Sequence, residues 1–458
     1  MSAGRVVVVG AGVAGLVAAR DLAAGGRDVT VLEASPGAGG CVAPLTVDGL
    51  RVDAGAESFA TRSPAVTDLL TELGLADDVV LPVASGAWLQ THRGAVPLPR
   101  AGMLGIPGSP WAADVRAVVG VAGALRASAD RLLPARVGHD AGSLGRLVRV
   151  RQGRRVLDRL VTPVVAGVHA AHPDEADLDA VLPGVRDRLA RHGSLGAAVA
   201  AMRAAAPAGS AVAGLRGGMH RLVAALVEDL TRRGVDVRSG TAVTRVERSG
   251  AAWRLVTADG SPLAADDVVV AVPGPVALGL LADVVPAAAT LDRPADTGVV
   301  LVTMALDAPA LDAAPRGTGL LVAPGAPGVR AKALTHATAK WPWLAEAAGP
   351  GRHVVRLSYG GPGHARVPAD DELFDAALAD AAHLLGVPLR PGQVLDRVRT
   401  PWPAGLPQVR PGHRERVSAV RDALERERGL HAVGAWLAGT GLVSVVADAR
   451  AVAARLAA

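Results

Sequence analysis

The stretch that decides the fold lies near the N-terminus, where residues 5–34 read RVVVVGAGVAGLVAARDLAAGGRDVTVLEA. Val6–Val9 are four β-branched residues in a row, which is typical of a strand buried on both faces. Leu16–Ala24 have the composition of a helix, and Val29–Leu32 repeat the strand pattern before Glu33 closes it. The stretch therefore predicts the strand, helix and strand that begin a doubly wound α/β domain.

The turn between the first strand and the helix carries Gly10, Gly12 and Gly15 in the pattern G-x-G-x-x-G. The first glycine permits a tight turn, the second lets the backbone approach a pyrophosphate, and the third lets the helix pack close to the strand. The positive end of the helix faces the phosphates. Glu33, about 20 residues on, is placed to accept hydrogen bonds from an adenosine ribose. The alternative is a glycine-rich turn that binds no ligand. The strand, glycines, helix, second strand and Glu33 follow one another at the expected spacing, which argues against that alternative.

Further glycines follow the second predicted strand. Gly39 and Gly40 lie just past it, and an alternating short strand then leads into the turn Gly55–Ser58. An NAD-binding domain normally completes its phosphate contacts in the first loop. Extra glycine-rich backbone beside the same site suits a longer cofactor, so the pattern favours FAD over NAD.

Two later parts of the chain are expected to return to this first domain and add strands to it. The expected strands are Val235–Arg238, Ala242–Val246, a buried run stopped by Pro273, and Leu430–Val433. A closing helix is predicted over Val445–Leu456, after a loop that contains Gly434, Gly439 and Gly441. Its N-terminus could stabilise the electron-rich end of a reduced flavin, although the same glycines also suit plain strand–helix turns.

These returns divide the chain into three parts. Residues 1–81, 211–294 and 401–458 are predicted to form a discontinuous FAD-binding domain. Residues 82–210 are predicted to be a helical, substrate-side insertion, and residues 295–400 a substrate-binding insertion. We expect the active site between these parts, because pockets tend to lie at domain interfaces.

The composition limits the function classes. Of the 48 Lys and Arg residues only Lys332 and Lys340 are lysines, which indicates a composition bias rather than nucleic-acid binding, since no basic block with interleaved aromatic residues is present. Cys41 is the single cysteine, which excludes an internal disulfide and fits a reducing cytoplasm. No signal peptide or apolar run of membrane-spanning length is expected. Peripheral membrane contact is left open.

Several stretches beyond the glycine motif resemble the FAD-dependent porphyrinogen oxidases of haem synthesis, most closely the bacterial coproporphyrinogen III oxidases and their protoporphyrinogen oxidase relatives. The resemblance covers nearly the whole chain. It is carried by GAESFATRSPAVTDLLTELGL (55–75), PLPRAGMLGIPGSP (97–110), RGGMHRLVAAL (216–226), KWPW (340–343) and WPAGLPQVRPGHRERVSAVRDAL (402–424). The KWP and LPQ…GH pieces discriminate better than the glycines that all flavin amine oxidases share.

The resemblance implies a Rossmann-like FAD-binding domain of the flavin amine oxidase type with inserted substrate-binding and helical domains, α/β in class and α+β overall. It also implies the residues that contact FAD. These are Gly10, Ala11, Gly12, Val13, Ala14, Gly15, Glu33, Ala34, Gly40, Gly55, Ala56, Glu57, Ser58, Val243, Trp402, Gly441, Leu442 and Val443. From the residues alone, Val243 is plain core.

Three departures from the family pattern stand out. Relatives usually carry a basic residue where this chain has Cys41. The eukaryotic branch has a propionate-binding basic residue where this chain has Val96, so that contact cannot be carried over. The closing turn usually continues with Pro, Asp and Cys, whereas this chain has Val443–Val445. The flavin contact there is therefore limited to the backbone.

The chemistry that the resemblance implies is the six-electron oxidation of coproporphyrinogen III to coproporphyrin III. Each of three steps transfers a hydride from a carbon between pyrroles to the flavin, and dioxygen reoxidises the flavin to give hydrogen peroxide. The product would pass to the next enzyme of the pathway. No catalytic acid or base can be singled out. No metal is expected, because His169 and His172 lack a third ligand of suitable spacing.

The substrate carboxylates need cations, for which arginine is well suited. The candidates are Arg93, Arg100, Arg149 and Lys340, although any one of them is more often a solvated surface charge. Coproporphyrinogen III is the expected substrate because it carries two more negative charges than protoporphyrinogen IX. The alternatives are a protoporphyrinogen IX oxidase, another flavin oxidase acting on amines or carotenoids, and a non-enzymatic flavin or porphyrin binder.

Overall fold

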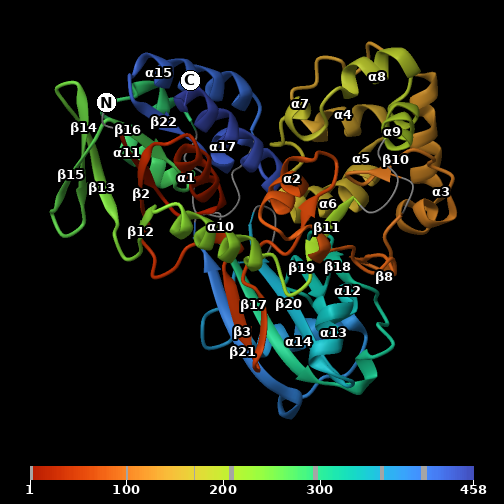
Figure 1. Ribbon diagram of the computed structural model, residues 1–458. Helices are drawn as coiled ribbons and strands as arrows, with labels where there is room; N and C mark the ends of the chain where they lie inside the picture. The colour runs from red at the N-terminus through yellow and green to blue at the C-terminus, as the bar shows by residue number, and fades with distance from the viewer. Residues whose placement is uncertain are drawn as a thin grey trace.

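The N-terminal stretch forms the centre of a five-stranded parallel sheet in the computed structural model, which describes residues 4–99, 102–169, 171–205, 211–291, 298–361, 366–403 and 410–457. In spatial order its strands are β12 (Asp236–Arg238), β2 (Asp28–Leu32), β1 (Arg5–Val9), β16 (Asp267–Val270) and β22 (Leu430–Ala432). Strands from three distant parts of the chain therefore share one sheet (Figure 1).

Helices cover both faces of this sheet, as the run of buried valines predicts. Val6 and Val8 pack into one hydrophobic core, and Val7 and Val9 pack into another. The first core is closed by α1 (Val13–Ala24), α2 (Ala65–Glu72), α10 (His220–Arg232) and α17 (Leu442–Ala457). The second is closed by α11 (Gly274–Leu281), α15 (His413–Arg426) and the short α16 (Ala435–Ala438).

Two sequence-based expectations were wrong in detail. The strand expected over residues 242–246 does not join the parallel sheet, because β13 (Val243–Ser249) pairs with β14 (Ala252–Thr257) and β15 (Pro262–Ala265) in a separate antiparallel sheet. Pairing with the next segment needs only a short loop and costs little chain entropy. Helices α1 and α17 also begin three residues earlier than predicted, directly after glycines at positions 12 and 441.

A seven-stranded sheet forms the second region, drawn below the first in Figure 1. In spatial order its strands are β21 (Val394–Trp402), β17 (Val299–Asp307), β20 (Arg352–Gly360), β19 (Ala333–His336), β18 (Gly319–Val322), β7 (Trp88–Thr91) and β8 (Gly94–Pro97). Helix α14 (Leu373–Leu385) covers one face. The other face meets α12 (Ala337–Lys340), α13 (Pro342–Ala348) and the hairpin β3 (Pro44–Val47) and β4 (Leu50–Asp53).

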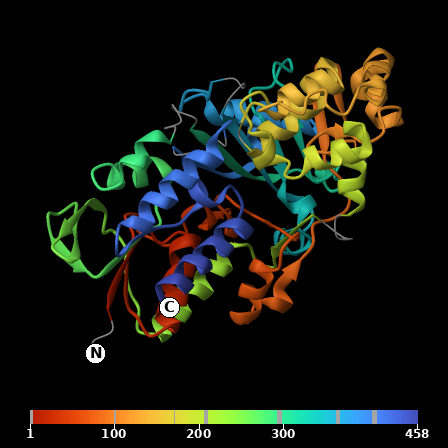
Figure 2. The ribbon, with the colours of Figure 1, turned by 90° about the horizontal axis from the view of Figure 1, so that it is seen from above.

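The third region is a cluster of helices that Figure 2 shows at the end of the molecule opposite the β13–β15 sheet. Its helices are α3 (Ala113–Ser128), α4 (Leu144–Arg151), α5 (Arg154–Val156), the π-helical turn Leu157–Val161, α6 (Thr162–His169), α7 (Leu178–Val181), α8 (Val185–His192) and α9 (Leu195–Ala204). Helix α3 is kinked at Gly120, which has a φ of 73°. No helix in the described part of the chain is both long and apolar enough to cross a membrane.

Short strands link the three regions. Strand β11 (Val212–Leu215) pairs with β5 (Phe59–Ala60) and with β6 (Val79–Val80), so the chain that leaves the helical cluster is fixed to the first region. The pair β9 (Gly102–Met103) and β10 (Ile106–Pro107) lies beside α9 in the helical cluster.

A fully buried arginine organises the helical cluster. Arg151 ends α4, and its Nε lies 2.5 Å from an oxygen of Asp130. Its remaining N–H groups donate to the carbonyls of Pro134 and Gly193, at 2.8 and 2.7 Å. The other oxygen of Asp130 accepts the N–H of Gly196 at the start of α9. One ion pair therefore joins α4 to the beginning of α9.

We expect Arg151→Met to lower the free energy of unfolding by about 3–5 kcal/mol, because it leaves the buried carboxylate of Asp130 without its counter-charge. The matched control is Arg149→Met on the same helix, whose partner Asp174 is exposed, and which should cost less than about 1 kcal/mol. Urea unfolding followed by circular dichroism measures both. Equal losses in the two variants would contradict this role for Arg151.

Two histidines form a buried chain inside the seven-stranded sheet. The ring of His336, which is fully buried, lies 3.0 Å from Nδ1 of His353. Nε2 of His353 lies 3.0 Å from Asp312, which is half exposed. Burial, together with the neighbouring His353, lowers the pKa of His336 to about 4. His336 is therefore neutral in the folded protein at pH 7.

Because the folded pKa of His336 lies below the unfolded value of about 6.5, its neutral form stabilises the fold above pH 6.5 and this stability is lost as the pH falls toward 4. The loss amounts to about 3 kcal/mol. We expect His336→Gln to remove this component of acid sensitivity, measured as the free energy of unfolding at pH 7 and pH 4.5. The exposed His139→Gln serves as the control, and an identical acid loss in His336→Gln and wild type would reject the assignment.

Candidate functional site

The turn after β1 needs glycine at two positions for steric reasons. A Cβ on Gly15 would lie 1.9 Å from the carbonyl oxygen of Gly10, so any side chain there would push α1 away from the strand. Gly10 has a φ of 105°, and its Cβ would lie 2.9 Å from the carbonyl oxygen of Ala271. Gly12 differs, because no heavy atom lies within 4 Å of its missing Cβ. The space over the start of α1 is therefore open.

The carboxylate of Glu33 lies against this turn. One oxygen accepts the N–H of Ala11 at 2.7 Å, and the other accepts the N–H and hydroxyl of Ser35 at 2.8 and 2.6 Å. The start of β13 runs alongside, since the N–H of Thr241 donates to the carbonyl of Glu33. This contact places Val243, two residues further on, close to the same end of the sheet.

The second glycine pair connects the first turn to the turn Gly55–Ser58. Gly39 donates its N–H to the carbonyl of Ala11 at 2.8 Å, and a Cβ on Gly40 would lie 3.6 Å from Cα of Gly12. The carbonyl of Cys41 accepts the N–H of Ala56 and leaves no room for a Cβ on Gly55. Cys41 itself, which replaces the usual basic residue, is exposed.

The closing turn leaves open space beside the same glycines. Gly439 and Gly441 have φ values of 90° and 112°, and nothing lies within 4 Å of either missing Cβ. Helix α17 begins at Leu442, so Leu442 and Val443 lie in its first turn, where N–H groups have no partner within the helix. Both residues share a hydrophobic core with the start of α1, and the C-terminal ends of α1 and α17 meet, since a Cβ on Gly25 would lie 3.3 Å from Cβ of Ala457.

Two indole groups beside these turns lack partners. Nε1 of Trp402 and of Trp436 are buried and have no hydrogen-bond acceptor among the residues that the structure describes. The ring of Trp402 would lie 3.2 Å from a Cβ on Gly55. Open space at three glycines, two uncapped helix ends and two free donors among the described residues fit a long anionic cofactor with a ring system. The predicted contact residues Gly10–Gly15, Glu33, Gly40, Gly55–Ser58, Trp402 and Gly441–Val443 lie on or beside these turns. Ala34 follows Glu33 and is exposed.

A buried ion cluster holds the turn Gly55–Ser58 against the seven-stranded sheet. One oxygen of Glu57 lies 2.5 Å from Nζ of Lys340, and the other lies 2.9 Å from Arg356 on β20. Arg356 also donates to the carbonyl of Gly55 at 2.9 Å. Burial alone would raise the pKa of Glu57, but Arg356 and Lys340 outweigh it, so the pKa is lowered. Lys340, expected among the substrate cations, is committed to Glu57.

Sequence reasoning missed a polar pair that positions α10. Asp53, at the end of β4, accepts the N–H groups of Met219 and His220 and lies 3.0 Å from Nδ1 of the His220 ring. The carboxylate therefore caps the start of α10 beside the turn Gly55–Ser58. The stretch RGGMHRL (216–222), which is one of those that resemble the family, contains His220 and could have pointed to this pair.

A cavity of about 520 Å³ lies between the β7–β8 hairpin and the helical cluster. Its charged lining consists of Arg93, Arg154, Arg159 and Asp158, together with His92 and His172. Arg154 pairs with Asp158 at 3.1 Å, and Arg159 donates to the carbonyl of Val118 beside the kink in α3. Arg93 has no ion-pair partner in the described part of the chain. Three guanidinium groups therefore face one carboxylate.

The other substrate candidates lie elsewhere. Arg149 is exposed and forms an ion pair with Asp174 at 2.5 Å. Arg100 lies outside the described residues. Val96 lines the cavity with an apolar side chain at the position where the eukaryotic branch has a cation. The structure thus groups Arg93 with Arg154 and Arg159, two arginines that sequence reasoning did not single out.

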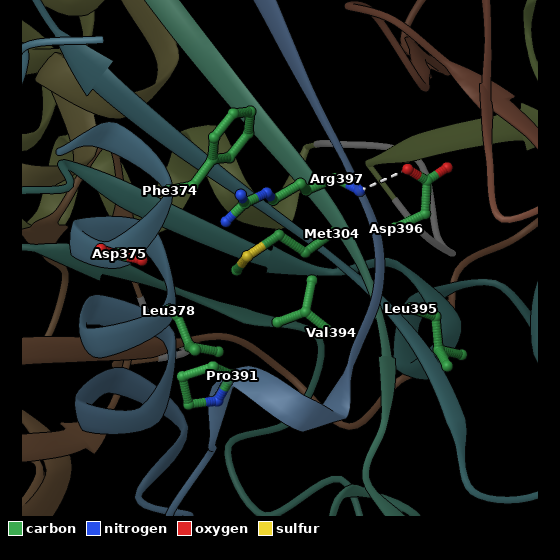
Figure 3. A pocket seen from close by; sticks show the side chains of 9 residues that line it. All are labelled: Met304, Phe374, Asp375, Leu378, Pro391, Val394, Leu395, Asp396 and Arg397. Carbon is green, nitrogen blue, oxygen red and sulfur yellow. Dashed lines mark hydrogen bonds between the residues drawn. The ribbon is translucent and has the colours of Figure 1, made fainter. Parts of the chain in front are cut away.

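A second cavity, of about 430 Å³, lies between α14 and strands β17 and β21. Figure 3 shows Arg397, Phe374 and Met304 around it, with the carboxylate of Asp396 directed away. The guanidinium of Arg397 stacks on Phe374 at 4.5 Å. Five residues of extended strand, roughly 16 Å, separate Arg397 from Trp402 at the glycine turns. The described lining of this second cavity has two aspartates, Asp375 and Asp396, beside its one arginine, so the balance of charge favours the arginine-lined cavity as the site of an anionic substrate.

Comparisons with known proteins agree with this geometry. Residues 13–457 match the family of flavin-containing amine oxidoreductases. The chain is 32% identical to a coproporphyrinogen III oxidase of Propionibacterium freudenreichii, over 97% of this chain and 89% of that one. It is 27% identical to a coproporphyrinogen III oxidase of Bacillus subtilis, over 98% of both. A crystal structure of a putative protoporphyrinogen oxidase from Exiguobacterium superposes with a TM-score of 0.86 at 28% identity, covering 100% of this chain and 99% of that one.

Two glycine substitutions should separate folding from cofactor binding. We expect Gly15→Ala to prevent normal folding, because its Cβ would lie 1.9 Å from a backbone oxygen. Gly12→Ala should fold but lower FAD affinity by tenfold or more, because its Cβ enters the space over the start of α1 where a pyrophosphate would approach.

The measurements are the flavin absorbance of the purified protein and FAD titration of the apoprotein. Gly392→Ala is the control, since its missing Cβ also faces open space but lies beside the distant second cavity. A Gly12→Ala protein that keeps FAD at wild-type affinity would reject this arrangement.

Proposed function

The chain belongs to the flavin-containing amine oxidoreductases and has FAD as its cofactor, and we propose that it oxidises coproporphyrinogen III to coproporphyrin III with dioxygen as electron acceptor. Hydrogen peroxide is the second product, and the reaction is a step of haem biosynthesis. The single observation that carries the proposal is the arginine-lined cavity on the same end of the seven-stranded sheet as Trp402. The coproporphyrinogen III oxidases among the relatives support it.

The residues around the glycine turns have separate parts in holding FAD. Glu33 binds the adenosine ribose, and the pyrophosphate lies over Gly12 at the positive end of α1. The start of α17 at Leu442 donates backbone N–H groups toward the electron-rich end of the flavin ring. Bound FAD supplies the acceptor for a hydride from the substrate carbon. The chain's own side chains bind and orient the two partners.

The arginine-lined cavity recognises the carboxylates of the substrate. Arg154 is partly neutralised by Asp158, whereas neither Arg93 nor Arg159 has an ion-pair partner among the described residues, and Arg159 donates to the backbone carbonyl of Val118. Guanidinium groups suit carboxylates because they bind both oxygens at once. Val96 offers no charge at the position where the eukaryotic branch has a cation. Arg154 and Arg159 on the helical side and Arg93 at the tip of the β7–β8 hairpin supply the positive charge instead.

Protoporphyrinogen IX is the alternative substrate, since the superposed structure is named a putative protoporphyrinogen oxidase. It brings two carboxylates to the cavity where coproporphyrinogen III brings four. The excess of positive charge in the cavity lining favours the substrate with more carboxylates. We place the reaction in the cytoplasm, on the basis of the single cysteine.

We expect a higher kcat/KM for coproporphyrinogen III than for protoporphyrinogen IX at low ionic strength. The difference should narrow as salt rises, because contacts between exposed charges are screened. Steady-state kinetics in air, with porphyrin fluorescence and oxygen uptake as readouts, measure both substrates. Hydrogen peroxide should accumulate without added NAD and in the presence of a chelator. A higher kcat/KM for protoporphyrinogen IX at both salt concentrations would transfer the assignment to that substrate.

A further inference from the structure

Lys332 is a buried cation without a partner. It is 6% exposed, and its backbone is held in the seven-stranded sheet, since its N–H donates to Ser358 at 2.8 Å and its carbonyl accepts from Val322 at 3.0 Å. No hydrogen bond or ion pair reaches its Nζ from any residue that the structure describes. Burial of an unpaired charge is costly, so a cation held in this way is a candidate binding group.

The acids that contact Arg330 and Ala331, the two residues before Lys332, already have partners. Asp380 accepts the N–H groups of Arg330 and Ala331 and the hydroxyl of Tyr359. Glu372 pairs with the side chain of Arg330 at 3.3 Å. Burial lowers the pKa of Lys332 to about 8, so the side chain is still mainly protonated at pH 7. The ammonium therefore lacks a counter-charge in the described part of the protein.

The composition makes a lysine at this position notable. The chain has 48 lysines and arginines, and all but two are arginine. Both lysines lie largely buried in the substrate region, where Lys340 holds Glu57 and Lys332 is unpaired. A lysine carries a compact point charge, whereas the broad guanidinium group of arginine needs more room. Such a compact charge suits the confined place of Lys332, since a Cβ on Gly361 would lie 3.1 Å from its Nζ.

The strand register places Lys332 between the cofactor turns and the arginine-lined cavity. At this end of the sheet Trp402 pairs with Val299, which pairs with Gly360. Lys332 directly precedes the next strand, β19, and Val322 and Gln90 lie beyond it. With strands about 4.8 Å apart, Lys332 lies roughly 10 Å from β7 at the cavity and roughly 15 Å from β21 beside Gly55.

We propose that Lys332 is the cation that pairs with a carboxylate of the bound tetrapyrrole, between the flavin and the arginine-lined cavity. The proposal rests on the proposed function and identifies a specificity residue for it. Lys340 has a different part, because Glu57 neutralises it and ties it to the cofactor turn. Of the two lysines, Lys332 is the one whose charge is available to substrate.

The test is the binding of coproporphyrin III to the purified FAD-loaded protein, compared with its tetramethyl ester, which has the same ring without carboxylate charge. Fluorescence titration gives both affinities. We expect Lys332→Met to weaken binding of the tetra-acid by tenfold or more and to change binding of the ester by less than twofold. Lys332→Arg should restore part of the lost affinity. Arg248→Gln, which removes a surface charge on β13, should leave both affinities unchanged.

Three outcomes for Lys332→Met would overturn the proposal. Equal losses of affinity for the tetra-acid and the ester would mean that the side chain only shapes the cavity. Unchanged affinity for both ligands, or a fall in kcat with unchanged affinity for the tetra-acid, would also reject it. If Lys332→Met does not fold, Lys332→Gln takes its place as the uncharged variant and Lys332→Arg remains the charged comparison, with circular dichroism and FAD content as checks. Failure of wild type to bind coproporphyrin III would overturn the proposed function itself, whereas a defect specific to Lys332 appears only in the variants.

Discussion

The ion cluster of Glu57 with Lys340 and Arg356 is the interaction on which the site depends. It joins the turn Gly55–Ser58, which comes from the N-terminal domain, to α12 and β20 of the seven-stranded sheet. Because the cluster is buried, removal of Glu57 would leave two cations inside the protein without their counter-charge. The contact therefore fixes the distance between the cofactor turns and the sheet that carries the substrate region.

The arginines of this chain divide into structural and available groups. Arg151 and Arg356 are buried and bonded to carboxylates and carbonyls, so they hold the fold. Arg93, Arg154 and Arg159 line a cavity in which Asp158 is the one carboxylate among the described lining residues. The net charge of +5 is therefore less informative than the identity of the cations that keep no internal counter-charge. Arg93 is one of these cations, and it lines the cavity that we propose for the substrate.

The first 33 residues were predictable because their constraints are local. Four valines, three glycines and an acid at fixed spacing are enough to specify the strand, turn, helix and strand, and the structure places β1, α1 and β2 there. The strand of residues 267–270 and the closing strand and helix were also predicted, apart from their ends. The strand of residues 242–246 was misplaced, because strand propensity says nothing about which strand becomes its neighbour.

The sequence by itself determined the cofactor-binding unit and the family, since glycines, a carboxylate and short motifs act through their spacing along the chain. Only the tertiary structure decided which charges are free. Lys340 and Lys332 look equivalent in the sequence, yet Glu57, 283 residues from Lys340, neutralises one of them and nothing in the described chain neutralises the other. The pairing of Asp53 with His220, and the meeting of Arg93 with Arg154 and Arg159, likewise depend on contacts between distant segments. Charge pairing is a property of distance in space, which the order of residues does not specify.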